Sequence, residues 1–317
     1  MEDTNRGKVV VVTGASAGVG RAVVTEFARQ GGRIGLIARG RERLEATKRE
    51  VEELGGKALV LPVDVADAQQ VEKAAERVEE ELGPIDIWVN DAMETVFSRF
   101  VDITPDEFKR ATEVTYLGFV YGTMEAMKRM APRNRGHIIQ VGSALAYRSI
   151  PLQSPYCGGK FAVRGFTDSL RCELIHDHSP IKLSMVHMPA LNTPQFSWAR
   201  THIERQPKPV GTIFQPEVGA DAVVHAARYP RREYWVGGST IAAILGNKVF
   251  PGWMDRIMAR ESYEQQWVKD KKRPLQDGNL FKPADLNLHK THGQFDAEAT
   301  TRSPTWDVMK WLSKLGG

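Results

Sequence analysis

The sequence predicts an α/β fold built on a doubly wound parallel β-sheet. Short runs rich in valine and isoleucine alternate with longer segments of helical periodicity from the N-terminus to about residue 190. The runs are apolar almost throughout, which is typical of strands that helices cover on both faces. Right-handed crossovers between such strands give a doubly wound sheet that binds ligands outside the carboxyl ends of its strands.

Each element follows from its own stretch of sequence. Strands are expected at 8–14 (KVVVVTG), 33–39 (RIGLIAR), 58–65 (ALVLPVDV), 85–91 (IDIWVND), 136–143 (GHIIQVGS) and 181–189 (IKLSMVHMP), and a last strand at 233–238 (EYWVGG). Helices are expected at 21–32, 41–56, 68–83, 104–130 and 154–177, and the first two end in glycine pairs that favour a helix stop.

The alternating pattern ends near residue 190. Four prolines between 189 and 209 predict a loop or helical flap at about 190–215. We therefore expect a single catalytic domain at 1–245 and a partly irregular C-terminal extension at 246–317, with no regular structure assigned to 271–304.

The last residues, TWDVMKWLSKLGG, have the spacing of a short amphipathic helix. Val308, Trp311, Leu312 and Leu315 fall on one face. We expect this face to dock on the parent domain or on a sister subunit, and we expect a homo-oligomer. Lysines beside it leave contact with an anionic membrane surface as the alternative.

Composition excludes several classes of function. The 317 residues are 42% hydrophobic and 26% charged, and the net charge of +4 comes from basic residues interleaved with acidic ones, so no nucleic-acid footprint is expected. Cys157 and Cys172 on one helix would lie about 22 Å apart, too far for a disulfide. No apolar signal segment begins the chain, and we expect a cytoplasmic protein. His176 and His178 point apart on a helix, so no metal site is expected.

A glycine-rich loop, TGASAGVG at 13–20, joins the first strand to the first helix. Glycines there permit a tight turn and close approach of the backbone to a pyrophosphate, and the helix N-terminus favours an anion. The alternative is a glycine-rich turn without a ligand. We expect a dinucleotide to bind at Gly14, Ser16, Gly18, Val19 and Gly20.

The next two strand ends predict which dinucleotide binds. Arg39 ends the second strand where an NAD site often places a carboxylate, so NADP is expected. The alternative is an arginine in solvent at a strand end. Arg43 is expected on an exposed helix face. Asp64 and Val65 end the third strand, where Asp64 can meet an adenine amino group or instead cap the next helix.

With these motifs in place, the chain resembles the short-chain dehydrogenase/reductase family from about residue 8 to 237. The resemblance rests on TGASAGVG, on Asp64–Val65, on NDAM at 90–93, and on Ser143 with Tyr156 and Lys160. It implies a Rossmann-type domain of the shorter, NADP-preferring type with a C-terminal extension. It also implies oxidoreduction of a small-molecule alcohol or ketone, and places Asn90 and Thr193 among the cofactor contacts.

The chemistry explains the residue types. Reduction of a carbonyl needs a hydride from one side and a proton from the other, and a tyrosine pKa of about 10 is too high for efficient exchange near neutrality. Tyr156 and Lys160 share one helix face, so we expect the ammonium to lower the pKa of the phenol. Ser143 can hold the substrate oxygen. The resemblance implies that Lys160 also binds the nicotinamide ribose.

Departures from the family pattern keep a second interpretation open. Thr115 stands where the family carries an asparagine that helps hold a proton-relay water, and Met93 replaces a glycine at the cofactor. We expect an oxidoreductase; the alternatives are an NADP-binding regulator or scaffold with little turnover and a sugar-nucleotide epimerase of related fold, which the glycine spacing favours less. Aromatic and apolar residues favour an apolar, ring-shaped substrate or simply pack the flap: Leu145, Ala146, Tyr147, Phe196, Trp198 and Phe214.

Overall fold

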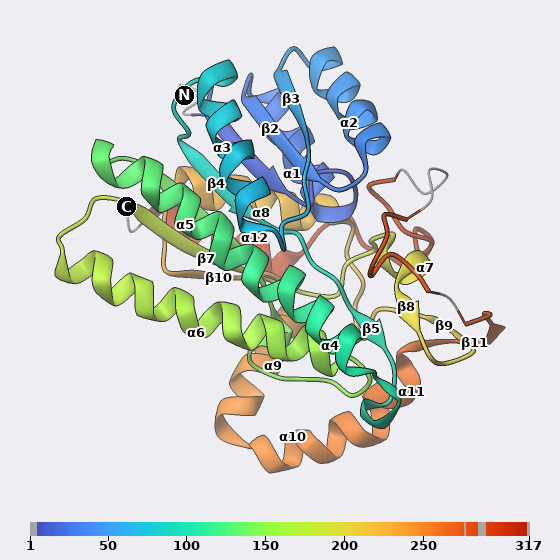
Figure 1. Cartoon of the computed structure of the whole chain (residues 1–317). Coiled ribbons are helices and arrows are strands. Elements are labelled where there is room, and N and C mark those ends of the chain that lie inside the picture. The colour runs from blue at the N-terminus through green and yellow to red at the C-terminus, as the bar shows by residue number, and fades with distance from the viewer. Residues whose placement is uncertain (1–4, 276, 285–289, 316–317) are drawn as a thin grey trace.

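Seven parallel strands form the central sheet in the computed structural model, which describes residues 5–275, 277–284 and 290–315 (Figure 1). They are β1 (Val9–Thr13), β2 (Arg33–Ala38), β3 (Lys57–Pro62), β4 (Ile87–Asn90), β6 (His137–Ser143), β7 (Lys182–Met188) and β10 (Glu233–Trp235). Their order across the sheet is β10-β7-β6-β4-β1-β2-β3, and every neighbouring pair is parallel. The predicted doubly wound α/β fold is confirmed.

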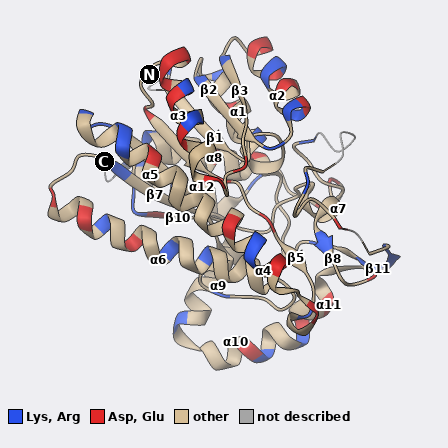
Figure 2. Cartoon of the chain, viewed as in Figure 1, with Lys and Arg blue, Asp and Glu red and all other residues tan. Residues whose placement is uncertain are grey.

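Helices cover both faces of this sheet (Figure 1). One face packs against α1 (Gly18–Arg29), α2 (Arg41–Glu53), α8 (Pro216–Arg228) and α12 (Pro304–Leu315). The other face packs against α3 (Ala68–Leu82), α5 (Gly118–Met130) and α6 (Ser154–His176). Figure 2 shows acidic and basic residues interspersed along α2 and α3, as the charge pattern predicts.

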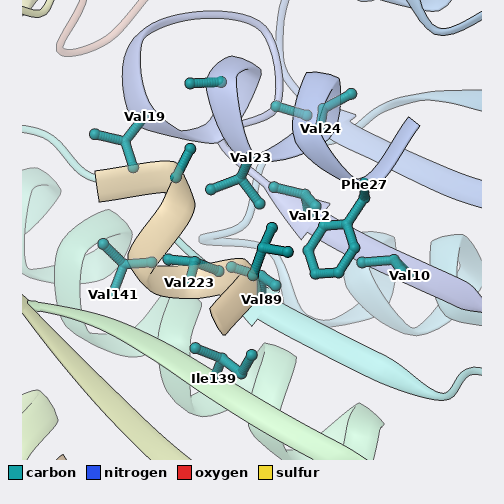
Figure 3. Close-up of a cluster of buried hydrophobic side chains, with 14 of the residues drawn as sticks. Val10, Val12, Val19, Val23, Val24, Phe27, Val89, Ile139, Val141 and Val223 are labelled. Carbon is teal, nitrogen blue, oxygen red and sulfur yellow. The ribbon is translucent and has the colours of Figure 1, made fainter. Parts of the chain in front are cut away.

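The alternation of side chains along β1 explains why the strand is apolar throughout. Val10 and Val12 belong to the core beneath α1 and α8, whereas Val9 and Val11 belong to the core on the opposite face. All four are fully buried, and each contributes about 1.5–3 kcal/mol of hydrophobic free energy. Figure 3 shows Val10 and Val12 among the side chains of α1, β4 and β6.

The strand order reverses between β1 and β4, which places a crevice at their carboxyl ends. The Thr13 hydroxyl accepts hydrogen bonds from the backbone N–H groups of Asp91 (2.9 Å) and Ala92 (3.1 Å). This joins the end of β1 to the end of β4, so the two strand ends that flank the crevice are fixed relative to each other.

The long helix predicted at 104–130 is broken into three parts. A capping box of Thr104 and Glu107, followed by Pro105, starts α4 (Pro105–Thr112). A π-helical turn, η2 (Glu113–Leu117), then leads into α5. π-Bulges of this kind interrupt α-helices frequently at functional sites, and η2 contains Thr115.

The flap and the extension contain more regular structure than the sequence predicts. Two small sheets pair β5 (Val96–Phe97) with β8 (Arg200–Thr201) and β9 (Arg205–Pro207) with β11 (Trp267–Lys272). Short helices complete the fold: η1 (Phe100–Asp102), η3 (Ala131–Arg133), η4 (Ala144–Ala146), α7 (Gln195–Trp198), α9 (Gly238–Val249), α10 (Pro251–Ile257), η5 (Met258–Ser262) and α11 (Tyr263–Gln265). Helix α9 crosses the boundary expected at 245, and part of 271–304 pairs with the domain, since Thr300 bridges to Phe214.

The C-terminal helix α12 docks on the domain, but by a different face from the one predicted. Val308, Trp311 and Leu312 are each more than half exposed. Trp306 instead is 2% exposed and packs edge-on against His225 and Tyr234. The Leu315 side chain lies outside the described side chains. Among the described helices, none has the length and apolar character needed to cross a membrane.

Candidate active site

A single cavity of about 450 Å³ lies at the carboxyl ends of the strands and joins most of the predicted site residues. Its walls include these members of the predicted set: Gly14, Ser16, Gly18, Val19, Arg39, Asp64, Val65, Ser143, Tyr156, Lys160 and Thr193. The glycine-rich loop, the ends of β2 and β3, the end of β6 and the start of α6 therefore meet in one space.

The glycine-rich loop has the shape that a pyrophosphate requires. Gly14 has a φ of +74°, and a Cβ there would lie 3.1 Å from backbone atoms of Ala92, so a side chain would crowd the loop against the end of β4. Ala17, the N-cap of α1, offers no side-chain acceptor to the first N–H groups of the helix. The Gly18 N–H donates to the carbonyl oxygen of Lys290 at 3.4 Å. A helix N-terminus beside a glycine-rich loop suits the phosphates of a dinucleotide.

Arg39 is held by a buried carboxyl group and by a distant part of the chain. Its Nη2 lies 2.5 Å from Glu94 Oε1, and the guanidinium also donates to the carbonyl oxygens of Asn279 and Leu280. Burial raises the pKa of Glu94 to about 8, although Arg39 and Arg110 oppose the shift. Arg39 is therefore part of a network and not a solvent-exposed strand end.

Arg43 is buried, contrary to the expected exposed face. It is 7% exposed, and its guanidinium lies 5.3 Å from the ring centre of Trp198 in the flap. Burial lowers its pKa, and the neighbouring Arg39 adds to the effect. A second guanidinium thus lines the cavity beside Arg39.

Asp64 lines the cavity while it pairs with Arg110 at 2.5 Å. It does not cap α3, because Asp67 does so by accepting hydrogen bonds from Gln69 N and Gln70 N. Of the two roles expected for Asp64, the cap is therefore wrong.

Ser143, Tyr156 and Lys160 meet at the other end of the cavity. Lys160 Nζ donates to the carbonyl of Val141 at 2.7 Å and lies 4.4 Å from the Phe119 ring centre and 5.7 Å from that of Tyr156. Burial lowers the pKa of Lys160 to about 8, with Asp91 opposing the shift. Asp91 itself is buried enough that its pKa rises to about 6 despite the attraction of Lys160.

The expected effect of Lys160 on Tyr156 is wrong for this structure. Burial raises the pKa of Tyr156, while a hydrogen bond with Ser143 opposes the rise. The physical reason is that the phenol is desolvated and the ammonium is directed to the carbonyl of Val141. Cys157, beside it, is a buried thiol whose pKa burial also raises, so it packs as a small hydrophobe and not as a reactive thiolate.

Three predicted residues do not line the cavity. Thr115 is fully buried, and its hydroxyl donates to Glu94 O and accepts from Glu94 N, both at 2.9 Å. Asn90 is fully buried and bonds the side chains of Trp88, Thr123 and Gln140. A Cβ on Gly20 would lie 2.4 Å from Gly14 O, so this glycine serves close packing. All three shape the framework behind the site.

Several cavity residues were not predicted: Arg43, Asp91, Glu94 and Asn279. Asp91 carried a signal, since it lies in the NDAM motif at 90–93 on which the family resemblance rests. For Glu94 and Asn279, the local sequence contains no motif that could have identified them as site residues. At the substrate end, Leu145 and Phe196 line the cavity, whereas Ala146, Tyr147 and Phe214 belong to packed clusters. Trp198 lines the cavity beside Arg43 instead. Ile150, Leu191 and Met258 add further apolar wall.

Comparison with known proteins gives a consistent result. The family model described as short chain dehydrogenase matches residues 8–203. An uncharacterized oxidoreductase of Bacillus subtilis is 31% identical over 284 residues, 89% of this chain and 80% of that protein. The 3-dehydrosphinganine reductase of Danio rerio is 35% identical over 234 residues, 70% of this chain and 68% of that protein. A solved structure of a Sinorhizobium meliloti protein described as a short-chain alcohol dehydrogenase has a TM-score of 0.56 and 27% identity, covering 59% of this chain and 74% of that one.

Proposed function

The chain belongs to the short-chain dehydrogenase family of oxidoreductases, and on that premise we propose that it transfers a hydride between NADP(H) and an apolar alcohol or ketone. One observation carries the proposal. A single cavity runs from the glycine-rich loop at Gly14 and Gly18 to Ser143, Tyr156 and Lys160. A dinucleotide with its phosphates at the loop would thus share one space with the acid/base residues.

Each residue has a defined part in this proposal. Bound NADPH would supply the hydride. Tyr156 gives the proton to the substrate oxygen in reduction, and its raised pKa keeps the hydroxyl protonated at neutral pH. Ser143 holds the substrate oxygen by its hydroxyl. Lys160, with a pKa of about 8, is mostly charged at pH 7 and places a cation beside the phenol.

The preference for NADP rests on two arginines. Arg39 and Arg43 both line the cavity at the end of β2, where a 2′-phosphate would lie. Guanidinium groups bind phosphate in a planar, bidentate geometry.

The walls near the catalytic serine favour a substrate with a large apolar body. Leu145, Ile150, Phe196 and Met258 line this end. The Danio rerio relative is named for a ketone, 3-dehydrosphinganine. We therefore propose long-chain ketones as the first compounds to test, beside ring-shaped ones.

The test is NADPH consumption, followed by its absorbance, with purified protein and a panel of apolar ketones. Tyr156→Phe should lower kcat by at least about 10²-fold, because general acid catalysis contributes about 10²–10⁴-fold, while the dissociation constant of NADPH stays near that of the wild type. Wild-type protein that binds NADPH but reduces no ketone would favour the regulator or scaffold instead. Undiminished turnover in Tyr156→Phe would refute the role of the phenol.

A further inference from the structure

A short segment of the C-terminal extension, residues 278–280, lies against the cofactor end of the cavity; we call it the strap. Arg39 donates hydrogen bonds to the strap carbonyl oxygens of Asn279 (2.5 Å) and Leu280 (3.1 Å). The Asn279 amide nitrogen donates to Glu94 Oε1 at 3.0 Å, the same oxygen that binds Arg39. Figure 1 shows this orange-red part of the chain beside α7.

The strap is anchored on both sides of Asn279. Leu280 is fully buried in a cluster with Val96 and Ala111, and its carbonyl also accepts a hydrogen bond from Arg110. Gly278 has a φ of +61°, and a Cβ there would lie 2.4 Å from the backbone of both Trp198 and Arg200. Only glycine allows this approach, so the strap is fitted to the flap as well as to Arg39.

The strap leaves the cavity open. Asn279 lines the same cavity as Gly18, Asp64 and Tyr156, and that cavity keeps a volume of about 450 Å³ with the strap in place. The strap is therefore a wall of the space and does not fill it.

The amide of Asn279 has a defined orientation. Glu94 Oε1 accepts from Arg39, so it is the nitrogen of Asn279 that faces it. The amide oxygen is buried and accepts no hydrogen bond from the part of the chain that the structure describes. A buried acceptor in this condition is destabilising, and a donor on a ligand would relieve it.

We propose that the strap forms the outer wall of the adenosine end of the cofactor site: Asn279 contacts the cofactor, and the strap carbonyls position Arg39 for the 2′-phosphate. The adenine amino group and the ribose hydroxyls are the donors that Asn279 can accept from. This inference rests on the proposed function and extends its cofactor site to the C-terminal extension.

The charges at the strap support this assignment. Burial raises the pKa of Glu94 to about 8, so at neutral pH this carboxyl is mostly protonated. Arg39 then keeps a positive charge that Glu94 does not neutralise, which favours a phosphate dianion. Arg43 adds a second positive charge to the same wall.

The test uses the full chain and measures binding of 2′,5′-ADP, 5′-AMP and NADPH by titration calorimetry. Asn279→Ala should weaken 2′,5′-ADP and 5′-AMP alike, by about tenfold, as expected for one lost hydrogen bond. Gly278→Ala should weaken both as well, because it displaces the strap from the flap without removing a cavity side chain. Arg39→Ala should weaken 2′,5′-ADP far more than 5′-AMP. The matched control is Asp277→Asn, which removes only an exposed ion pair with Arg200 and should bind like the wild type.

The outcomes separate the two proposals. Suppose that Asn279→Ala unfolds at the same temperature as the wild type and binds both nucleotides at least as tightly. The proposal that the strap is a wall of the cofactor site would then be overturned. If Asn279→Ala and Asp277→Asn lost the same amount of nucleotide affinity, the proposed contact between Asn279 and the cofactor would be overturned. The segment would then affect binding only through its contribution to folding. Failure of the wild type to bind NADPH and both nucleotides would refute the proposed function itself.

Discussion

Glu107 offers a stability prediction whose size and pH dependence follow from its contacts. The carboxylate accepts a hydrogen bond from Thr104 N at 2.9 Å, bonds Arg200, and lies 2.9 Å from His202 Nε2. It joins the start of α4 to the flap, and its side chain is 2% exposed. Burial alone would raise the pKa of Glu107, but these hydrogen bonds outweigh it and lower the pKa to about 2.

The magnitude follows from linkage. A shift from an ordinary glutamate pKa of about 4.3 to about 2 corresponds to roughly 3 kcal/mol at neutral pH. Because the folded-state pKa is the lower one, this stabilisation is present above the unfolded pKa and is lost as the pH falls towards 2. Glu107→Gln keeps the shape and removes the charge, so its free energy of unfolding should lie up to about 3 kcal/mol below the wild type at pH 7. The difference should fall to about half by pH 3.

Urea unfolding of both proteins at pH 7 and pH 3 measures this difference. Glu113→Gln is the matched control, since its carboxylate lies 3.9 Å from Lys109 on the surface and such pairs contribute less than about 1 kcal/mol. A Glu107→Gln difference that is absent at pH 7, or that is the same at both pH values, would show that the carboxylate does not hold the flap by its charge.

Two further predictions concern α12 and Glu94. Trp306→Ala should lower the free energy of unfolding by about 3–5 kcal/mol, because this ring is buried and its Nε1 donates to Asp221 at 2.7 Å. Trp311→Ala, on the exposed face, should change the free energy of unfolding little. Equal losses of stability in thermal unfolding would contradict the assignment of the Trp306 face as the docked one. Since the folded-state pKa of Glu94 is raised to about 8, the wild type should lose stability as the pH rises from about 5 to 8. Glu94→Gln should flatten that slope, and parallel unfolding profiles for the two proteins would show that Glu94 is ionised throughout.

The strands could be predicted from the sequence because both of their faces are buried, so each strand is apolar along most of its length. Each of Val9 to Val12 enters one of the two cores, so the whole run is apolar and needs no knowledge of its partners. Helix α8 was not assigned for a related reason. Most of its residues are buried, so it lacks the polar face that gives a surface helix its period.

The sequence patterns were less informative about the directions in which side chains point. The apolar spacing of α12 correctly predicts a helix, but it cannot tell which face meets the domain; hydrogen bonds from Trp306 and Lys310 to Asp221 fix the observed face. The helix spacing likewise places Lys160 near Tyr156, yet the direction of the ammonium depends on the carbonyl of Val141 at the end of β6. Motif spacing gives proximity, whereas the pKa of Tyr156 is set by desolvation and by where each charge points.

The Arg39 end of the cavity also depends on contacts that local motifs do not predict, here between residues far apart in the sequence. Arg39 was identified from its place at the end of β2, but its partners, Glu94 and Asn279, come from parts of the chain that no local motif connects. If the strap holds Arg39, then Arg39 also holds the strap, because coupling between two sites is reciprocal. If the proposed cofactor site is right, replacing Arg39 should both remove the contact to the 2′-phosphate and loosen a wall that serves any adenosine nucleotide. The ratio of NADPH to NADH affinity isolates the first effect, and the affinity for 5′-AMP isolates the second.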